Sequence, residues 1–296
     1  MERKKFTTES NFDMEKQTEQ LPKKWEELTF ADNFIFCKVL ESDTELCRQV
    51  LELLLHIEIE RLEVPVAEKT VLGTADSKSV RFDVYVKNST TVFDIEMQTV
   101  IKPDLAKRAR YYQGMIDMDG LPPGKVYGKL RDSYVIFICL TDPFDAGLPV
   151  YSFENLCIES PEIKLNDRAY KIFFNASACD KLTSAEEKAF FKFVRGISAE
   201  SDLTKTLDEK VSRIKQSGAE RRRYMTWEQT ILEERELARE AGRTEGFEAG
   251  ARNNAIENAR NLLQETDLSP EKIALCCSVS LEEVLQLKEE LVERQQ

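Results

Sequence analysis

The chain has 296 residues and a formal net charge of −12, with 54 acidic residues against 42 basic ones. This balance argues against simple coating of nucleic acid, which depends on neutralising phosphates, but it allows a nuclease that concentrates basic residues locally. No apolar run approaches the roughly 20 residues that span a membrane, and the seven cysteines contain no Cys-x-x-Cys pair, which favours reduced thiols in a cytoplasmic protein.

The N-terminal third begins with a polar stretch and continues with helical spacing. Residues 1 to about 22 are charged and aperiodic, so we expect a disordered arm without a secretory signal. Two helices are predicted next, the second starting near Ser42-Asp43. Their apolar faces comprise Phe30, Phe34, Val39 and Leu40, then Leu46, Val50, Leu53 and Leu54. The single histidine, His56, excludes sites built on several histidines, and we expect it in the core or at the helix end.

Two short strands that carry acids, at 80–86 and 92–98, are the most informative feature. The polar residues between them suit the turn of an antiparallel hairpin. Alternation places Asp83 on the face opposite Val80, Phe82, Val84 and Val86, and it groups Asp94, Glu96 and Gln98 on one face. Such acids are often merely solvated. However, Asp83 interrupts an apolar strand, and two carboxylates beside an amide oxygen suit a hard cation such as Mg²⁺, which can support phosphodiester cleavage.

The other predicted elements complete an α/β sandwich around a mixed sheet. We expect strands at about 58–67 and at 134–140, β-like segments at 151–153 and 170–174, and a helix at about 184–194. A further helix begins after Pro103, with an apolar stripe of Leu105, Ala109, Tyr112 and Ile116. Basic side chains at its start are candidates for binding the DNA backbone, namely Lys102, Lys107, Arg108 and Arg110.

From about residue 200 the composition changes to charged helices with few aromatics. We therefore divide the chain into an arm (1–22), a core (23–200) and a helical C-terminal extension (201–296). Glycines recur at 242, 246 and 250 in helix-forming sequence, which indicates either close approach of a partner helix or a flexible linker. Helices at about 255–265, 270–277 and 281–293 resemble a helix-turn-helix in outline, and we favour packing or homo-oligomerisation over DNA contact for this acidic segment.

Four segments together resemble a known group of enzymes. They are Phe30-Ala31-Asp32-Asn33-Phe34-Ile35-Phe36, Arg81-Phe82-Asp83-Val84-Tyr85-Val86, Asp94-Ile95-Glu96-Met97-Gln98 and Lys107-Arg108-Ala109-Arg110-Tyr111-Tyr112. Their order and spacing are similar to the PD-(D/E)XK nuclease superfamily and, more narrowly, to the bacterial Rpn family of recombination-promoting nucleases and transposases. The resemblance covers most of the chain from about residue 25. It implies a restriction-endonuclease-like core, DNA as the substrate and a metal-dependent endonuclease that uses Mg²⁺ or Mn²⁺ in recombination or mobile elements.

The resemblance also assigns site residues. Asp83 matches the metal-binding aspartate and Glu96 the second metal-binding acid, while Gln98 stands where the wider superfamily has a lysine. Glutamine can orient a water but brings no positive charge, so Lys102, Lys107 and Arg108 are candidates to supply it. Candidates for a further acid in the first helix are Asp32 and Glu41, although Asp32 could equally cap that helix.

Two alternative hypotheses use the same fold without catalysis. The acidic charge and the missing lysine motivate a degenerate module that binds DNA or a protein. The charged tail motivates an interaction protein in which the helices assemble oligomers and the α/β core is a scaffold.

Overall fold

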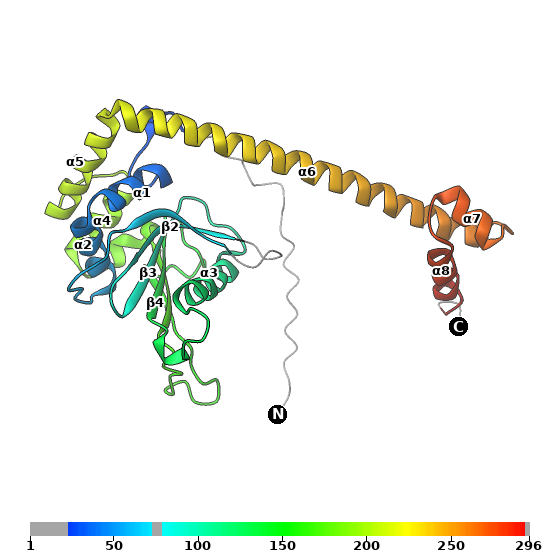
Figure 1. The fold of residues 1–296 in the computed structure, drawn as a ribbon, viewed down its shortest axis with the longest axis horizontal. Helices are drawn as coiled ribbons and strands as arrows, with labels where there is room; N and C mark the ends of the chain where they lie inside the picture. The colour runs from blue at the N-terminus through cyan, green and yellow to red at the C-terminus, as the bar shows by residue number, and fades with distance from the viewer. Residues whose placement is uncertain (1–22, 73–78, 294–296) are drawn as a thin grey trace. The chain divides into compact units, whose positions relative to one another are not determined.

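A mixed six-stranded sheet forms the centre of the protein in the computed structural model, which describes residues 23–72 and 79–293 (Figure 1). The strand order is β1-β2-β3-β4-β6-β5. The strands are β1 (Val66–Val71), β2 (Val80–Lys87), β3 (Thr91–Gln98), β4 (Asp132–Cys139), β5 (Val150–Phe153) and β6 (Ala169–Asn175). β1, β2 and β3 are antiparallel, β3, β4 and β6 are parallel, and β5 runs antiparallel to β6. The predicted α/β class is confirmed, whereas the arm predicted for residues 1–22 lies outside the described residues.

Helix α3 (Leu105–Gly120) makes the crossover between the parallel strands β3 and β4 and packs on one face of the sheet (Figure 1). The expected apolar stripe is the buried one, with Leu105, Ala109 and Ile116 in the same cluster as Phe137 of β4. Next to α3, the Phe82 ring lies 5.2 Å from the Tyr112 ring. This layer covers the acidic face of β3.

The opposite face is covered by a layer of helices: α1 (Asn33–Ser42) packs on β1 and β2, while α2 (Thr44–Leu55), α4 (Ala185–Val194) and α5 (Asp202–Gln216) pack against α1 or one another. Aromatic contacts join the layers: Phe174 of β6 stacks on Phe191 of α4 at 5.4 Å, and Phe30 lies 5.3 Å from Phe193. Short 3₁₀ helices lie at Trp25–Glu27, Tyr127–Lys129 and Ala176–Lys181. The sheet is therefore sandwiched between helices, as the sequence predicted.

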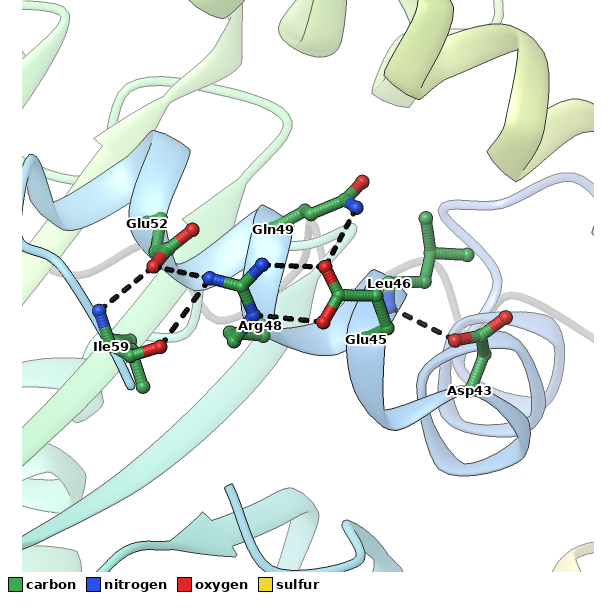
Figure 2. A network of polar contacts seen from close by, with 7 residues as sticks. All are labelled: Asp43, Glu45, Leu46, Arg48, Gln49, Glu52 and Ile59. Carbon is green, nitrogen blue, oxygen red and sulfur yellow. Dashed lines mark hydrogen bonds and ion pairs between the residues drawn. The ribbon is translucent and has the colours of Figure 1, made fainter. Parts of the chain in front are cut away.

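Both ends of α2 are fixed by polar contacts (Figure 2). Asp43 caps the start, because its Oδ1 accepts the Leu46 N–H at 3.0 Å. Near the other end, Arg48 donates to Glu52, whose Oε1 also accepts the Ile59 N–H at 2.8 Å and so orients the chain that leaves the helix. His56 ends α2 with a left-handed φ of 53° and a side chain that is 68% exposed, 3.2 Å from Glu187. Its helix-end role is confirmed, and a core role is wrong.

Two local predictions are wrong. The strand expected at about 58–67 lies at Val66–Val71, because Pro65 has no N–H for pairing. Before it, the Glu63 N–H bonds the Lys87 carbonyl oxygen at the end of β2, but no strand forms. Strict alternation in β2 also fails, since Phe82 and Tyr85 both contact α3. The β1–β2 ladder pairs Ala67 with Val84 and Lys69 with Phe82, and it skips the position between them. Glu68 of β1 lies at that position and has a left-handed φ of 52°. Asp83 thus lies where the strand changes face.

The chain divides into two compact units, residues 1–224 and 225–296. In the first, α5 packs on α1, and the Trp25 ring lies 5.5 Å from Tyr224 near the start of α6 (Gly218–Glu265). This unit extends past residue 200, where the sequence placed the end of the core. None of the helices described is both long enough and apolar enough to cross a membrane.

The second unit packs the end of α6 against α7 (Pro270–Cys277) and α8 (Leu281–Glu293). Its core consists of Ala259, Ile273, Val284 and Leu287. The expected helices at 270–277 and 281–293 are confirmed, whereas the one expected at 255–265 is the end of a continuous α6. The three glycines at 242, 246 and 250 lie on its exposed part with open space beside each backbone.

Candidate active site

The hairpin strands part where Asp83 and Glu96 face each other. The β2–β3 ladder ends at the pair Val84 and Ile95, and side chains replace the next backbone bonds. The Asp83 N–H donates to Glu96 Oε1 at 2.9 Å, and the Met97 N–H donates to Asp83 Oδ2 at 3.0 Å. The two acids that the sequence paired are therefore adjacent, and two central strands hold them rigidly.

Helix α1 supports Asp83 through residues that sequence analysis missed. Asn33 makes a side-chain hydrogen bond to the Asp83 carboxyl. One turn later, the Cys37 thiol donates to the Asp83 carbonyl oxygen at 3.2 Å and lies 3.8 Å from Asn33 Oδ1. The only signal in the sequence is the spacing of four residues, which places both side chains on one helix face.

The two acids proposed for the first helix have other partners. Asp32 accepts hydrogen bonds from the Thr29 N–H and hydroxyl and pairs with Lys23 at 2.7 Å. It occupies the N-cap position of α1 but makes no side-chain capping bond there. Glu41 pairs with Lys38 at 2.9 Å and accepts the Ala67 N–H. The α1 side chain that hydrogen-bonds the Asp83 carboxyl is thus the amide of Asn33.

Helix α3 contributes Arg108 to the site. Its Nη1 donates to Gln98 Oε1 at 3.0 Å, and its Nη2 donates to Glu96 Oε2 at 3.3 Å and to the Tyr112 hydroxyl at 3.1 Å. The Gln98 amide in turn donates to the Met97 carbonyl at 3.0 Å. The other basic residues predicted to contact DNA, Lys102, Lys107 and Arg110, are exposed. The structure therefore brings together Asp83, Glu96, Gln98 and Arg108 and leaves the remaining three on the surface.

Burial makes this cluster electrostatically costly. Glu96 is 1% exposed, whereas Asp83 keeps partial access to solvent. Burial raises the pKa of Asp83 to about 6, against the hydrogen bonds from the Met97 N–H and Asn33 that lower it. Burial and the negative charge of Asp83 hold the pKa of Glu96 well above its usual range, with Arg108 opposing the rise. The carboxyls of the metal-free site therefore retain protons to higher pH than free carboxyls do, and a bound cation would favour their ionised forms.

Asp94 is a third acid of the cluster, and no role was predicted for it. It is completely buried, and neither carboxylate oxygen receives a hydrogen bond from a donor in the described residues. Its polar neighbour is the Glu96 carboxyl, and these two acids can share a hydrogen bond only when one carries a proton. Burial, reinforced by the charge of Asp83, raises the pKa of Asp94 well above its usual range. The alternation Asp94-x-Glu96-x-Gln98, which places the three side chains on one face of β3, is the sequence feature that could have predicted Asp94 as a member of the cluster.

The donor set fits a hard divalent cation by its chemistry. Asp83 and Glu96 offer carboxylate oxygens, the ligands that Mg²⁺ and Mn²⁺ prefer. Three closely packed carboxyls, two of them buried, face the single guanidinium of Arg108, and a cation would supply the further positive charge that ionisation of all three requires. Within the described segments, no three or more His, Cys, Asp or Glu side chains surround a common metal position. Only the two facing acids, with water or substrate completing the shell, could hold the ion.

Comparison with known proteins now identifies the class. The sheet and its acidic cluster lie within residues 33–245, which match the family model described as PD-(D/E)XK nuclease family transposase. This match covers most of the chain, so the protein belongs to the PD-(D/E)XK nuclease family of transposases, and the predicted resemblance is confirmed. Membership indicates a hydrolase of the nuclease type. Neither the curated proteins nor the solved structures contain a match to this chain.

Proposed function

We propose that the protein is a Mg²⁺- or Mn²⁺-dependent endodeoxyribonuclease that hydrolyses phosphodiester bonds of DNA in recombination or in the movement of mobile elements. The observation that carries the proposal is the adjacent carboxyl pair of Asp83 and Glu96 where β2 and β3 part. The Asp83 N–H donates to Glu96 Oε1, and the Met97 N–H donates to Asp83 Oδ2. Membership in a family of nuclease-type transposases supports DNA as the substrate.

Each residue of the site would have its own role in hydrolysis. Asp83 and Glu96 would hold the cation, which polarises the phosphate and lowers the pKa of a nearby water. The Gln98 side chain lies beside them and can orient that water by hydrogen bonding. Arg108 adds positive charge inside the site, while the exposed Lys102, Lys107 and Arg110 would bind the DNA backbone.

The test is cleavage of supercoiled and linear DNA by the pure full-length protein with Mg²⁺, Mn²⁺, Ca²⁺ or EDTA. We expect cutting with Mg²⁺ or Mn²⁺ that falls by about 100-fold or more in Asp83→Ala, since even the outer partners of metal ligands contribute roughly 10–100-fold. Asp208→Ala, the same change at an exposed position of α5, should cut normally. Activity that survives in a pure Asp83→Ala sample would refute the assignment.

A second candidate function is a DNA- or protein-binding module without turnover. Two observations favour it: Gln98 provides no positive charge where the wider superfamily has a lysine, and Arg108 already donates to Glu96 Oε2, an oxygen that a catalytic cation would need. The same preparations distinguish the two functions when DNA retention is measured by gel shift. Retention without cutting in any metal would support the binding module, whereas cutting that depends on Asp83 would exclude it.

We also propose that copies of the chain associate through the helical extension. The exposed part of α6 carries Leu237 and Phe247, which are 66% and 78% exposed, beside the three glycines. A cytoplasmic location is supported by the cysteines, all seven of which lie in described segments and are unpaired, four of them buried.

A further inference from the structure

Arg108 is set apart from the other basic residues near the start of α3 by its burial and its contacts. Its side chain is 23% exposed, while Lys102, Lys107 and Arg110 are exposed to solvent. The guanidinium carbon lies over the Tyr112 and Phe137 rings, 5.3 and 5.7 Å from their centroids, while its N–H groups donate to polar groups. Such a guanidinium is part of the site and is not a surface contact for DNA.

The charge of Arg108 acts on a whole cluster. Asp83, Asp94 and Glu96 are three carboxyls packed within one hairpin, and Arg108 attracts all of them. Its direct ion pair is with Glu96. Burying carboxylates without a compensating cation is costly, so the cluster needs a positive charge even when no metal is bound. Arg108 supplies that charge.

The contacts of Arg108 are arranged so that one can be lost without the others. Its bond to Glu96 Oε2, at 3.3 Å, is longer than those to Gln98 Oε1 and the Tyr112 hydroxyl, at 3.0 and 3.1 Å. The other oxygen of Glu96 accepts the Asp83 N–H. Oε2 is therefore the oxygen of Glu96 that a cation would take, and Arg108 holds it by its longest contact.

We propose that Arg108 is the resident counter-cation of this carboxylate cluster, and that it competes with the divalent cation for Glu96 Oε2. When the cation binds Asp83 and Glu96, Arg108 yields that oxygen and stays anchored to Gln98 and Tyr112. This inference rests on the proposed metal site. Arg108 thus stabilises the metal-free site in its folded arrangement. Because of this competition, the cation binds more weakly than it would to the same carboxylates without Arg108.

The experiment measures metal binding without any reaction. Full-length wild type, Arg108→Gln and the matched control Arg110→Gln are freed of metal with EDTA and exchanged into chelator-free buffer at about pH 8. Mn²⁺ is then titrated by calorimetry, and thermal unfolding is recorded with and without Mn²⁺. We expect Arg108→Gln to bind Mn²⁺ at least about tenfold more tightly, which corresponds to about 1.4 kcal/mol, and to unfold at a lower temperature without metal. Arg110→Gln should match the wild type in both measurements.

Arg108→Lys covers the case in which the glutamine variant does not fold. Lysine keeps the charge but lacks the planar fork that spans Glu96 and Gln98, so we expect Mn²⁺ binding between that of wild type and Arg108→Gln. Unchanged or weaker Mn²⁺ binding in a folded Arg108 variant would overturn the inference while leaving the metal site intact. Absence of Mn²⁺ binding in the wild type would refute the metal site itself and, with it, this role of Arg108.

Discussion

Burial of Asp83 couples the site to the stability of the fold. Its pKa is raised from the ordinary 3.8 to about 6 in the folded protein. Between these values the folded chain retains a proton that the unfolded chain has released, so the free energy of unfolding of the metal-free protein falls as the pH rises through this interval. Asp83→Asn cannot ionise and should escape that loss. We expect its stability relative to wild type to increase by about 1 kcal/mol between about pH 5 and pH 8.

Urea denaturation in EDTA at these two pH values measures the difference. Asp208→Asn, at an exposed position of α5, is the matched control, and its stability relative to wild type should not change with pH. An Asp83→Asn difference that is the same at both pH values would show that the carboxyl ionises as freely in the folded protein as in the unfolded chain.

Some residues of the site could be predicted from local sequence pattern, and others could not. Asp83, Glu96 and Gln98 lie on adjoining strands of one hairpin, so strand alternation and a short turn were enough to bring them together. Asn33 of α1 hydrogen-bonds Asp83 and Arg108 of α3 hydrogen-bonds Glu96, and packing places these two helices on opposite faces of the sheet. No periodic pattern in the sequence predicts these contacts of Asn33 and Arg108 with the acids. Only the family resemblance, which includes segments 30–36 and 107–112, indicated that α1 and α3 belong to the site.

Asp43, at the start of α2, makes a capping bond and an ion pair. Asp43 Oδ1 accepts the Leu46 N–H at 3.0 Å, and Oδ2 pairs with Lys210 of α5 at 2.9 Å. Burial alone would raise the pKa of Asp43, but the bonds from Lys210 and Leu46 lower it. Asp43→Ala removes both contacts, so we expect a loss of about 1–2 kcal/mol in the free energy of unfolding.

Lys210→Met is the informative comparison, because it removes the ion pair and keeps the cap. Urea denaturation of both single variants and the double variant apportions the two contributions. We expect Lys210→Met to cost less than Asp43→Ala, since a partly exposed ion pair contributes about 0–1 kcal/mol. Equal losses in the two variants would mean that the cap contributes nothing.

Other elements show where local signals succeed and where tertiary structure overrides them. Asp43 and Pro103 are start signals that act within one turn, and the helices predicted from them are present. The strand expected at 58–67 was displaced because Pro65 cannot donate to a ladder. Strict alternation in β2 failed between Phe82 and Tyr85, where the strand changes face beside Asp83. At this point the β1–β2 ladder skips the position of Glu68, which has a left-handed φ, so the irregularity depends on another strand.

Composition predicts a helical extension from about residue 201, and the first compact unit runs to Tyr224. Few aromatics occur after residue 200, yet α5 buries Leu207 and Val211, and Tyr224 packs against Trp25 and Phe34. Long-range contacts of this kind, nearly 200 residues apart in the chain, leave no signal in local composition. The first compact unit consequently includes residues up to Tyr224.

The exposed stretch of α6 is the proposed contact between copies of the chain. Isolated exposed apolar residues are common, but Leu237 and Phe247 lie on the same exposed stretch of α6 as three glycines, whose backbones leave room for a second helix to approach. If copies associate there, light scattering should give the full chain a mass that is a multiple of 34.1 kDa. A chain ending at Tyr224 retains the whole core of the first unit and should be monomeric. Leu237→Glu with Phe247→Glu in the full chain should also give monomers, because burying two new carboxylates at a helix contact is unfavourable. An oligomer that persists in both would place the contact on the first unit.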